Sequence, residues 1–335
     1  MKTQILVTGS AGFIGSHVTK ELLRRGYSVV GVDSFSDYYS TQLKQLRIEQ
    51  FNSEKNFRFE QINIANLSEV EKVCLSSNFD GVIHLAAQAG VRLSLQQSSR
   101  YIESNITGFY NILRKSIELN IPKFVYASSS SVYGDLSPLP YSESSKIMSP
   151  KSFYGTTKLN NEQSAQILTS KSQTSTRGLR YFTVYGPWGR PDMAYFRLMA
   201  AALGKHHFTM FGDGSVQRDF TYIEDVVQTT VDLFENMSST NKTSNDIVNI
   251  GGHRPLSMNY LIKLIQEISG CNFKIEKEEQ NPNDSQKTVA DNSYLTSLLG
   301  ERKFTSLEVG IENFYSWMQR KEIISNVENW IKSST

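Results

Sequence analysis

The chain has 335 residues, which is long enough for one large α/β domain with an additional lobe. Hydrophobic residues make up 39% and the formal net charge is +2, so the composition gives no support to a nucleic-acid or membrane-surface role. The two cysteines, Cys74 and Cys271, are far apart, which argues against a disulfide framework and a metal cluster. Because no long apolar stretch follows Met1, we expect a cytoplasmic protein. No cysteine or carboxylate cluster lies near His206 and His207, so we expect no metal site.

The first half of the sequence alternates short apolar runs with segments of helical spacing. The runs are Ile5–Thr8, Ser28–Asp33, Phe57–Ile62, Gly81–Leu85 and Lys123–Ala127. They are apolar on both faces, as in buried parallel strands. One helical segment starts at Phe13 and ends at Gly26, and another is expected to open with a capping box from Ser68 to Glu71. This alternation predicts an α/β fold with a Rossmann-type, doubly wound parallel sheet.

The pattern becomes less regular after Pro187, and this change suggests a domain boundary. The sequence predicts a long helix over 149–170 and a strand over 177–183. Further strands are expected at 208–211, 247–250 and 271–275, helices at 223–234 and 256–268, and a surface loop at 238–245. We therefore expect a main domain over 1–186 and a smaller C-terminal α/β lobe over 187–335, with some elements returning to the main sheet.

A glycine-rich turn lies between the first predicted strand and the first helix. Gly9, Gly12 and Gly15 give the pattern G-x-x-G-x-x-G, whose backbone can approach a pyrophosphate at the start of a helix. The second strand ends in Asp33, where a carboxylate would accept hydrogen bonds from the ribose 2′-OH of NAD and repel the phosphate of NADP. An incidental glycine turn is the alternative, but strand, glycines, helix and acid agree on an NAD site.

Three further residues suggest redox chemistry on an alcohol. Tyr154 and Lys158 are four residues apart and share one face of the predicted helix. Ser129 lies where the fifth strand ends, at the edge of the sheet where α/β proteins bind ligands. A nearby Lys⁺ and a bound NAD⁺ would favour the phenolate, making Tyr154 a usable base near neutral pH. Taken alone, the Tyr-Lys pair would be an ordinary surface pair on a helix.

Together these motifs resemble the extended short-chain dehydrogenase/reductase family, whose members act mostly on nucleotide sugars, and the resemblance covers nearly the whole chain. It implies catalytic roles for Ser129, Tyr154 and Lys158, with Lys158 holding the nicotinamide ribose. It also implies tightly bound, recycled NAD. The expected cofactor-binding residues, besides the three glycines and Asp33, are Ala11, Phe13, Ile14, Asn63, Ile64, Leu85, Ala86, Ala87, Asn105, Tyr154, Lys158 and Tyr181. Asn63 departs from an aspartate common in the family, so weaker adenine contacts are expected there.

The two residues after the catalytic serine suggest the reaction. Family members that eliminate water or lose CO₂ carry carboxylates after this serine, whereas this chain has Ser130 and Ser131. Without these proton-transfer groups, hydride removal, rotation of the keto sugar and hydride return remain, which is epimerisation.

The stretch from Arg180 to Ala194 resembles the signature of the UDP-glucuronate 4-epimerase branch of the family. A uronate carries a carboxylate, which guanidinium recognises bidentately. We therefore expect Arg190 to bind it, with Thr183 and Ser131 as hydroxyl partners and Gln88 and Ser130 beside the substrate. A surface role for Arg190 is the alternative, and Arg92 is left unassigned between substrate and structure.

The segment from Phe211 to Phe220 resembles the family's uridine-diphosphate segment. It implies that Arg218 neutralises the diphosphate and that Phe211 flanks the uracil; an ordinary glycine-rich hairpin is the alternative. The resemblance further implies a homodimer with a four-helix interface. Competing hypotheses are a 4-epimerase acting on UDP-glucose or UDP-N-acetylglucosamine, a non-catalytic NAD-binding regulator, and a net reductase, which Asp33 disfavours.

Overall fold

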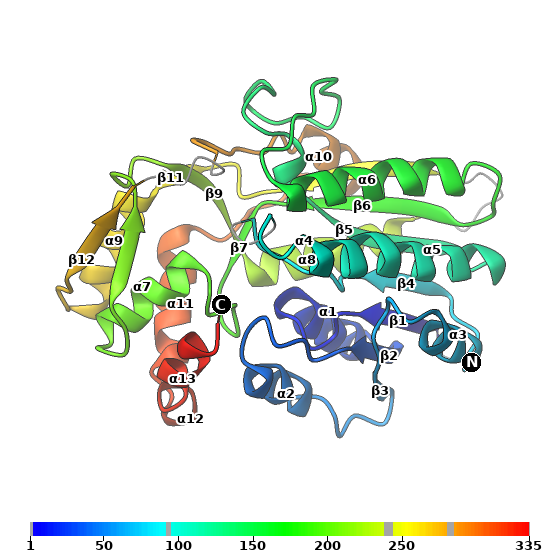
Figure 1. The fold of residues 1–335 in the computed structure, drawn as a ribbon, viewed down its shortest axis with the longest axis horizontal. Helices are drawn as coiled ribbons and strands as arrows, with labels where there is room; N and C mark the ends of the chain where they lie inside the picture. Colours follow the sequence, from blue (N-terminus) through cyan, green and yellow to red (C-terminus); the bar gives the residue numbers. More distant parts are fainter. Residues whose placement is uncertain (1–2, 92–94, 238–243, 280–284, 335) are drawn as a thin grey trace.

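A computed structural model of the chain describes residues 3–91, 95–237, 244–279 and 285–334. Its centre is a seven-stranded sheet, parallel throughout, in the order β10-β6-β5-β4-β1-β2-β3 (Figure 1). The strands are β1 Gln4–Thr8, β2 Ser28–Asp33, β3 Phe57–Gln61, β4 Gly81–His84, β5 Lys123–Ser129, β6 Ser175–Tyr181 and β10 Asn245–Ile250. The five strands predicted for the first half are all present, and the Rossmann-type fold is confirmed.

Helices cover both faces of this sheet. The first group is α1 Phe13–Arg24, α2 Thr41–Glu49 and α8 Ile223–Asn236, and α1 packs directly against α8. The second group is α3 Leu67–Leu75, α4 Ser98–Tyr101, the π-helical segment η1 Ile102–Gly108, α5 Phe109–Glu118 and α6 Phe153–Leu168. The connections diverge at β1, which pairs with β2 on one side and β4 on the other. The carboxyl ends of the strands at such a switch point form the usual ligand crevice of doubly wound folds.

The C-terminal part of the chain builds two small sheets beside the main one (Figure 1). One contains β7 Thr183–Tyr185, β9 Gln217–Tyr222 and β11 Pro255–Ser257, and the other contains β8 Phe208–Phe211 and β12 Ile275–Glu278. The helices are α7 Ala194–Ala202, α9 Met258–Ser269, α10 Ser293–Leu299, α11 Leu307–Met318, α12 Lys321–Ile324 and α13 Val327–Lys332; a short 3-10 turn, η2, covers Ser130–Val132. Trp317 and Trp330 are buried and pack the last helices. β10 follows residue 187 in the chain but belongs to the main sheet, so residues 187–335 do not form a separate fold. The division near residue 187 remains a prediction about function.

Several local boundaries differ from the prediction. The expected capping box is wrong: α3 begins at Leu67, and its cap is Asn66, whose side chain accepts from the Ser68 N–H while Glu69 bonds back to Asn66. The helix predicted over 149–170 starts at Phe153, because the side chain of Ser152 caps it. The strand expected at 271–275 begins at Ile275, where it pairs with Phe208. Most of the predicted loop at 238–245 lies outside the described residues.

Candidate active site

The glycine-rich turn forms the floor of the site between β1 and α1. Gly9 has φ +72°, and a Cβ there would approach the backbone nitrogen of Ala86 to 2.7 Å. A Cβ on Gly15 would collide with the carbonyl oxygen of Gly9, so close backbone packing requires glycine at both positions. The α1 helix begins without a side-chain cap at Gly12, so its first N–H groups are available to an anion.

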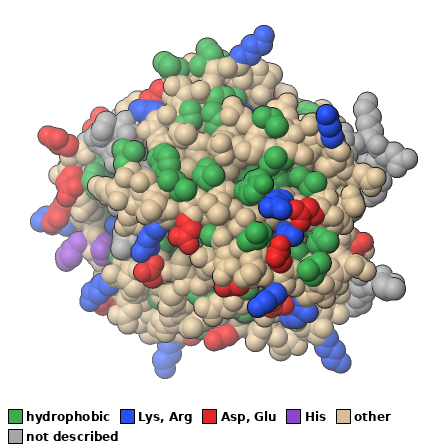
Figure 2. Space-filling view, turned by 45° about the vertical axis from the view of Figure 1, so that its right-hand side comes forward, with side chains coloured by type: hydrophobic (Ala, Val, Ile, Leu, Met, Phe, Trp, Pro, Cys, Tyr) green, Lys and Arg blue, Asp and Glu red, His purple; other side chains and the backbone are tan. Residues whose placement is uncertain are grey.

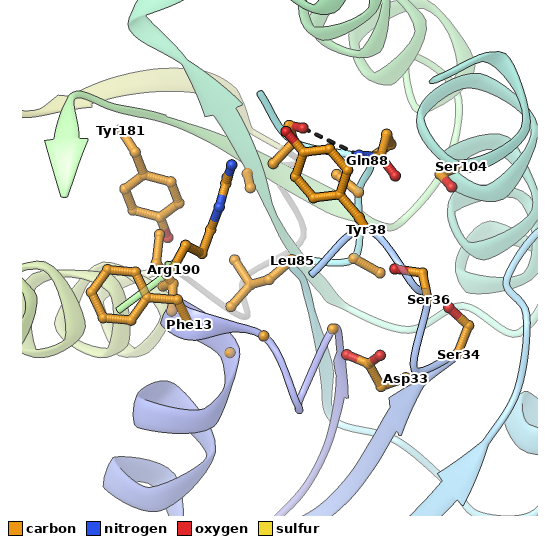
Figure 3. Close-up of a pocket in the computed structure, with 18 of the residues that line it drawn as sticks. Phe13, Asp33, Ser34, Ser36, Tyr38, Leu85, Gln88, Ser104, Tyr181 and Arg190 are labelled. Atoms are coloured by element: carbon orange, nitrogen blue, oxygen red, sulfur yellow. Dashed lines mark hydrogen bonds between the residues drawn. The ribbon is translucent and has the colours of Figure 1, made fainter. Parts of the chain in front are cut away.

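Asp33 stands at the end of β2, opposite this turn. Its carboxylate accepts from the backbone N–H of Ala11 at 3.2 Å and of Phe35 at 2.9 Å. Both bonds fix the carboxylate at the edge of a cavity, which Figure 3 shows with Asp33, Ser34 and Ser36 at one end and Phe13, Tyr181 and Arg190 at the other. The lining residues at its two ends suit a dinucleotide with a sugar beside it.

The segment after β4 forms a wall of the cavity. Leu85, Ala86, Ala87 and Gln88 line it. Gln88 is fixed by Asn105 of η1, which accepts from the Gln88 N–H at 2.8 Å and donates to its carbonyl at 3.0 Å. Asn105 also donates to Thr157 on α6, so one buried amide joins the wall, the π-helical segment and the helix that carries Tyr154.

Tyr154, Lys158 and Ser129 meet in this cavity, as the motif predicted. Lys158 Nζ lies 5.9 Å from the Tyr154 ring centroid and donates to the Ala127 carbonyl at 2.9 Å. Burial raises the pKa of Tyr154, while the charge of Arg190 and a hydrogen bond with Ser129 oppose the rise. Burial lowers the pKa of Lys158 to about 8, against the opposing charge of Glu162. The protein alone therefore does not supply the phenolate, and a positive charge arriving with a cofactor would favour it.

The serine run places its hydroxyls unevenly. Ser129 Oγ donates to Ser131 Oγ at 3.1 Å and accepts from the Ser131 N–H at 3.1 Å, so these two hydroxyls act as a pair. Ser128 points the other way and donates to Glu162, a buried carboxylate on α6 that also pairs bidentately with Arg180 of β6 at 2.7 and 2.8 Å. Ser128, Glu162 and Arg180 thus join β5 and β6 to α6, the helix that carries Tyr154 and Lys158.

Arg190 lines the cavity, but its geometry differs from the expected one. Its Nε and Nη2 atoms pair with both carboxylate oxygens of Asp192, so the bidentate partner of the guanidinium is a residue of the chain itself. The guanidinium carbon lies 5.7 Å from the ring centroid of Tyr38. Tyr38 in turn touches Gly90, where a Cβ would come within 2.5 Å of the tyrosine hydroxyl. Asp192 and Tyr38 therefore hold Arg190 in place. Asp192 binds the Nε and Nη2 atoms of Arg190 and not its Nη1 atom.

The remaining predicted residues are spread over the site and the C-terminal part. Asn63 lines the cavity and donates to Glu103 at 2.9 Å; Ile64 and Ile14 line it as well. Thr183 begins β7, and Ser130 starts the η2 turn. Phe211 and Arg218 lie on β8 and β9 rather than in this cavity's lining, and Arg218 donates to the Ser285 carbonyl at 2.7 Å. Arg92 lies outside the described residues.

The sequence reasoning missed a group of residues from the loop after β2 and from α2. Tyr38, Tyr39 and Lys44 line the cavity, and Lys44 Nζ lies 4.5 Å from the Tyr39 ring centroid. The paired tyrosines followed by a lysine on a short helix were a visible signal, because aromatic residues next to a predicted ribose site are natural ligand contacts. Lys44 donates to the carbonyl and hydroxyl of Ser36, which keeps this loop against the cavity.

The described residues contain no group of three or more His, Cys, Asp or Glu side chains placed to hold a metal ion, and no described helix is long and apolar enough to cross a membrane. The residues present fit NAD instead. The close-packed glycines and the uncapped start of α1 offer N–H donors for a pyrophosphate, and the fixed carboxylate of Asp33 offers an acceptor for a ribose hydroxyl, as a dinucleotide needs.

The fold and this site define a dinucleotide-dependent enzyme whose cavity is lined by a tyrosine and a lysine of one helix. Residues 5–251 match the model of the NAD dependent epimerase/dehydratase family, and the chain belongs to this family. A UDP-glucuronate 4-epimerase of Thermodesulfobacterium geofontis is 37% identical over 325 residues, covering 96% of this chain and 98% of its own.

Solved structures agree with this assignment. UDP-glucuronic acid 4-epimerase from Bacillus cereus, in complex with UDP-glucuronic acid and NAD, superposes with a TM-score of 0.88 and 36% identity, covering 95% of this chain and 99% of its own. UDP-glucose 4-epimerase from Thermotoga maritima, with UDP-glucose, gives a TM-score of 0.85 and 30% identity, covering 96% and 100%.

Proposed function

We propose that the protein interconverts UDP-glucuronate and UDP-galacturonate by inverting C4 of the sugar, with NAD as a recycled cofactor. The observation that carries this proposal is the lining of the cavity: among its described residues Asp33 is the one carboxylate, and it lies at the end away from Arg190. No described acid stands beside Tyr154 to assist elimination of water or loss of CO₂. Hydride removal and return remain as the available chemistry.

In this reaction Tyr154 takes the proton from the C4 hydroxyl as the C4–H bond breaks, and it returns the proton when the bond re-forms on the other face. Bound NAD would supply the acceptor for the C4 hydride and the donor for its return. Ser129 orients the C4 oxygen through its hydroxyl, and Ser131 fixes the Ser129 hydroxyl in turn. Lys158 holds the nicotinamide ribose and adds positive charge beside the phenol. Rotation of the 4-keto sugar between the two hydride transfers produces the inversion.

The substrate is bound along the rest of the cavity and into the C-terminal part. Arg190 provides the positive charge for the uronate carboxylate; because Asp192 occupies its Nε and Nη2 atoms, recognition uses Nη1 and the charge rather than the bidentate fork. Thr183, Ser131, Ser130 and Gln88 supply hydroxyl and amide partners. Arg218 faces the diphosphate and Phe211 the uracil, so residues 187–335 serve mainly as the UDP-sugar lobe.

A second candidate, a 4-epimerase for neutral UDP-sugars, is favoured by one specific observation. The guanidinium of Arg190 already has a carboxylate partner in Asp192, so the site does not strictly require a charged sugar. The similarity of this chain to a UDP-glucose 4-epimerase also favours a neutral substrate. Substrate charge separates the two candidates.

We also propose a homodimer formed through α4, α5 and α6. Three large hydrophobic side chains of these helical segments are exposed: Ile102 (48%), Tyr110 (44%) and Ile167 (70%). Several exposed hydrophobic side chains on one set of helices favour a protein interface over isolated surface residues. Figure 2 shows hydrophobic side chains gathered on the face it presents, interspersed with charged ones. Light scattering on Tyr110→Glu against the unaltered protein tests this, since a charge in the interface would yield monomers.

The two free cysteines, one of them exposed, accord with a cytoplasmic location.

The experiment that tests the function is incubation with UDP-glucuronate and separation of the UDP-sugars. UDP-galacturonate without net NADH supports the proposal, whereas a UDP-pentose or turnover of UDP-glucose alone contradicts it.

A further inference from the structure

Arg47 on α2 is completely buried, yet it touches none of the catalytic residues. All five of its N–H bonds have acceptors. Nη1 donates to the Ala11 carbonyl at 3.0 Å and to the Tyr39 hydroxyl at 2.6 Å. Nε donates to the Trp188 carbonyl at 3.0 Å, and Nη2 donates to the carbonyls of Trp188 and Gly189 at 2.7 and 3.1 Å.

The charge of Arg47 has no partner of opposite sign within the part of the chain that the structure describes. The other deeply buried arginines do have one: Arg177 pairs with Asp246, and Arg180 pairs with Glu162. A buried cation surrounded only by neutral acceptors is costly. Its first acceptor, Ala11, belongs to the glycine turn, directly before the uncapped start of α1. The negative charge that compensates Arg47 is therefore expected to arrive with the pyrophosphate of the cofactor.

The second set of acceptors lies on the segment that carries Arg190. Trp188 has φ +61°, a left-handed conformation that residues other than glycine rarely adopt. Arg47 binds the carbonyl of this strained residue twice and the carbonyl of Gly189 once, so it stabilises the turn directly before Arg190. The α2 helix is itself anchored, because Trp330 of α13 donates to Gln42 at 3.0 Å.

We infer that Arg47 is a positioning residue that couples the dinucleotide turn to the sugar-recognition turn. One guanidinium holds Ala11 and the Trp188–Gly189 turn together, so cofactor retention and the placement of Arg190 depend on the same side chain. The part of this inference that concerns the sugar rests on the proposed function, whereas the part that concerns NAD does not.

The test compares Arg47→Met, Arg47→Lys and, as a matched control, Arg177→Met. Arg177 is equally buried but lies at the far end of β6. For each folded variant we would measure bound NAD after acid release, NAD affinity of the stripped protein by calorimetry, and the ratio of kcat/KM for UDP-glucuronate to that for UDP-glucose. Thermal midpoints report the structural cost.

Arg47→Met is expected to weaken NAD binding about tenfold or more, because the positive charge beside the pyrophosphate is lost, and to lower the specificity ratio because the hydrogen bonds to the Trp188–Gly189 turn are lost. Arg47→Lys keeps the charge but not the fork, so NAD affinity stays near the original value while the ratio falls. Arg177→Met lowers the midpoint and changes neither readout. The inference is overturned if Arg47→Met behaves like Arg177→Met, or if Arg47→Lys restores the ratio.

If Arg47→Met does not fold, the ratio measured on Arg47→Lys decides. If the unaltered protein does not turn over UDP-glucuronate, the proposed function fails, and NAD affinity still tests Arg47.

Discussion

The Glu162–Arg180 ion pair beneath the catalytic residues gives the most quantitative prediction. The two side chains are 7% and 4% exposed and form two hydrogen bonds of 2.7 and 2.8 Å. Glu162→Gln leaves the guanidinium buried without its counter-charge. Removing one partner of such a pair costs about 3–5 kcal/mol, whereas an exposed pair is worth far less.

The assay is urea unfolding followed by tryptophan fluorescence, with Glu118→Gln as control. Glu118 pairs with Arg114 on the surface of α5, with side-chain exposures of 38% and 47%. Glu162→Gln should lower the free energy of unfolding by about 3–5 kcal/mol, and Glu118→Gln should leave it unchanged within error. Equal effects of the two substitutions would refute the reasoning.

Glu162→Gln has a second, functional consequence. The charge of Glu162 opposes the burial that lowers the pKa of Lys158 to about 8. Without it the pKa falls further, so Lys158 loses its proton at lower pH. We expect the alkaline decline of NAD affinity to move to lower pH in this variant, measured by calorimetry between pH 7 and 9; an unmoved decline would show that Lys158 does not control it.

Three other predictions concern single residues. Tyr154→Phe should slow epimerisation roughly a hundred- to ten-thousand-fold while bound NAD stays unchanged, and loss of NAD instead would indicate a binding role. Asp33→Ser should weaken NAD about tenfold and improve the relative affinity for NADP, as measured by titration; an unchanged preference would remove Asp33 from the ribose site. Burial lowers the pKa of His84 to about 3, below its ordinary 6.5, so the unfolded chain binds the extra proton as pH falls. Stability should drop by about 2 kcal/mol between pH 6.5 and 5, and His84→Asn, if it folds, should reduce this slope in unfolding titrations.

Much of the fold could be predicted because its determinants are local in sequence. The apolar runs that became β1, β2 and β4 are buried on both faces, and the glycines between β1 and α1 stand where a Cβ would collide with neighbouring backbone. Element ends were less predictable. Asn66 caps α3 through its side chain, which accepts from the Ser68 N–H, whereas the sequence pattern favoured Ser68 as the cap.

The site was predicted only in part, because some contacts depend on tertiary structure. Tyr154 and Lys158 are one helical turn apart, so their meeting was visible in the sequence. The pairing of Arg190 with Asp192 was not, since it depends on the Trp188 turn that Arg47 holds from a distant helix. A motif identifies which residue type stands at a position. Which hydrogen-bonding atoms of that residue remain available to a ligand depends on its neighbours in the folded protein.

The central claim is that this site inverts C4 of a charged UDP-sugar and regenerates its cofactor. The most direct measurement uses UDP-glucuronate deuterated at C4, with the product analysed by NMR and mass spectrometry. We predict UDP-galacturonate that keeps the deuterium at C4, without net NADH, because the same hydride is removed and returned. A product with hydrogen at C4, or a UDP-pentose with loss of CO₂, would contradict this claim.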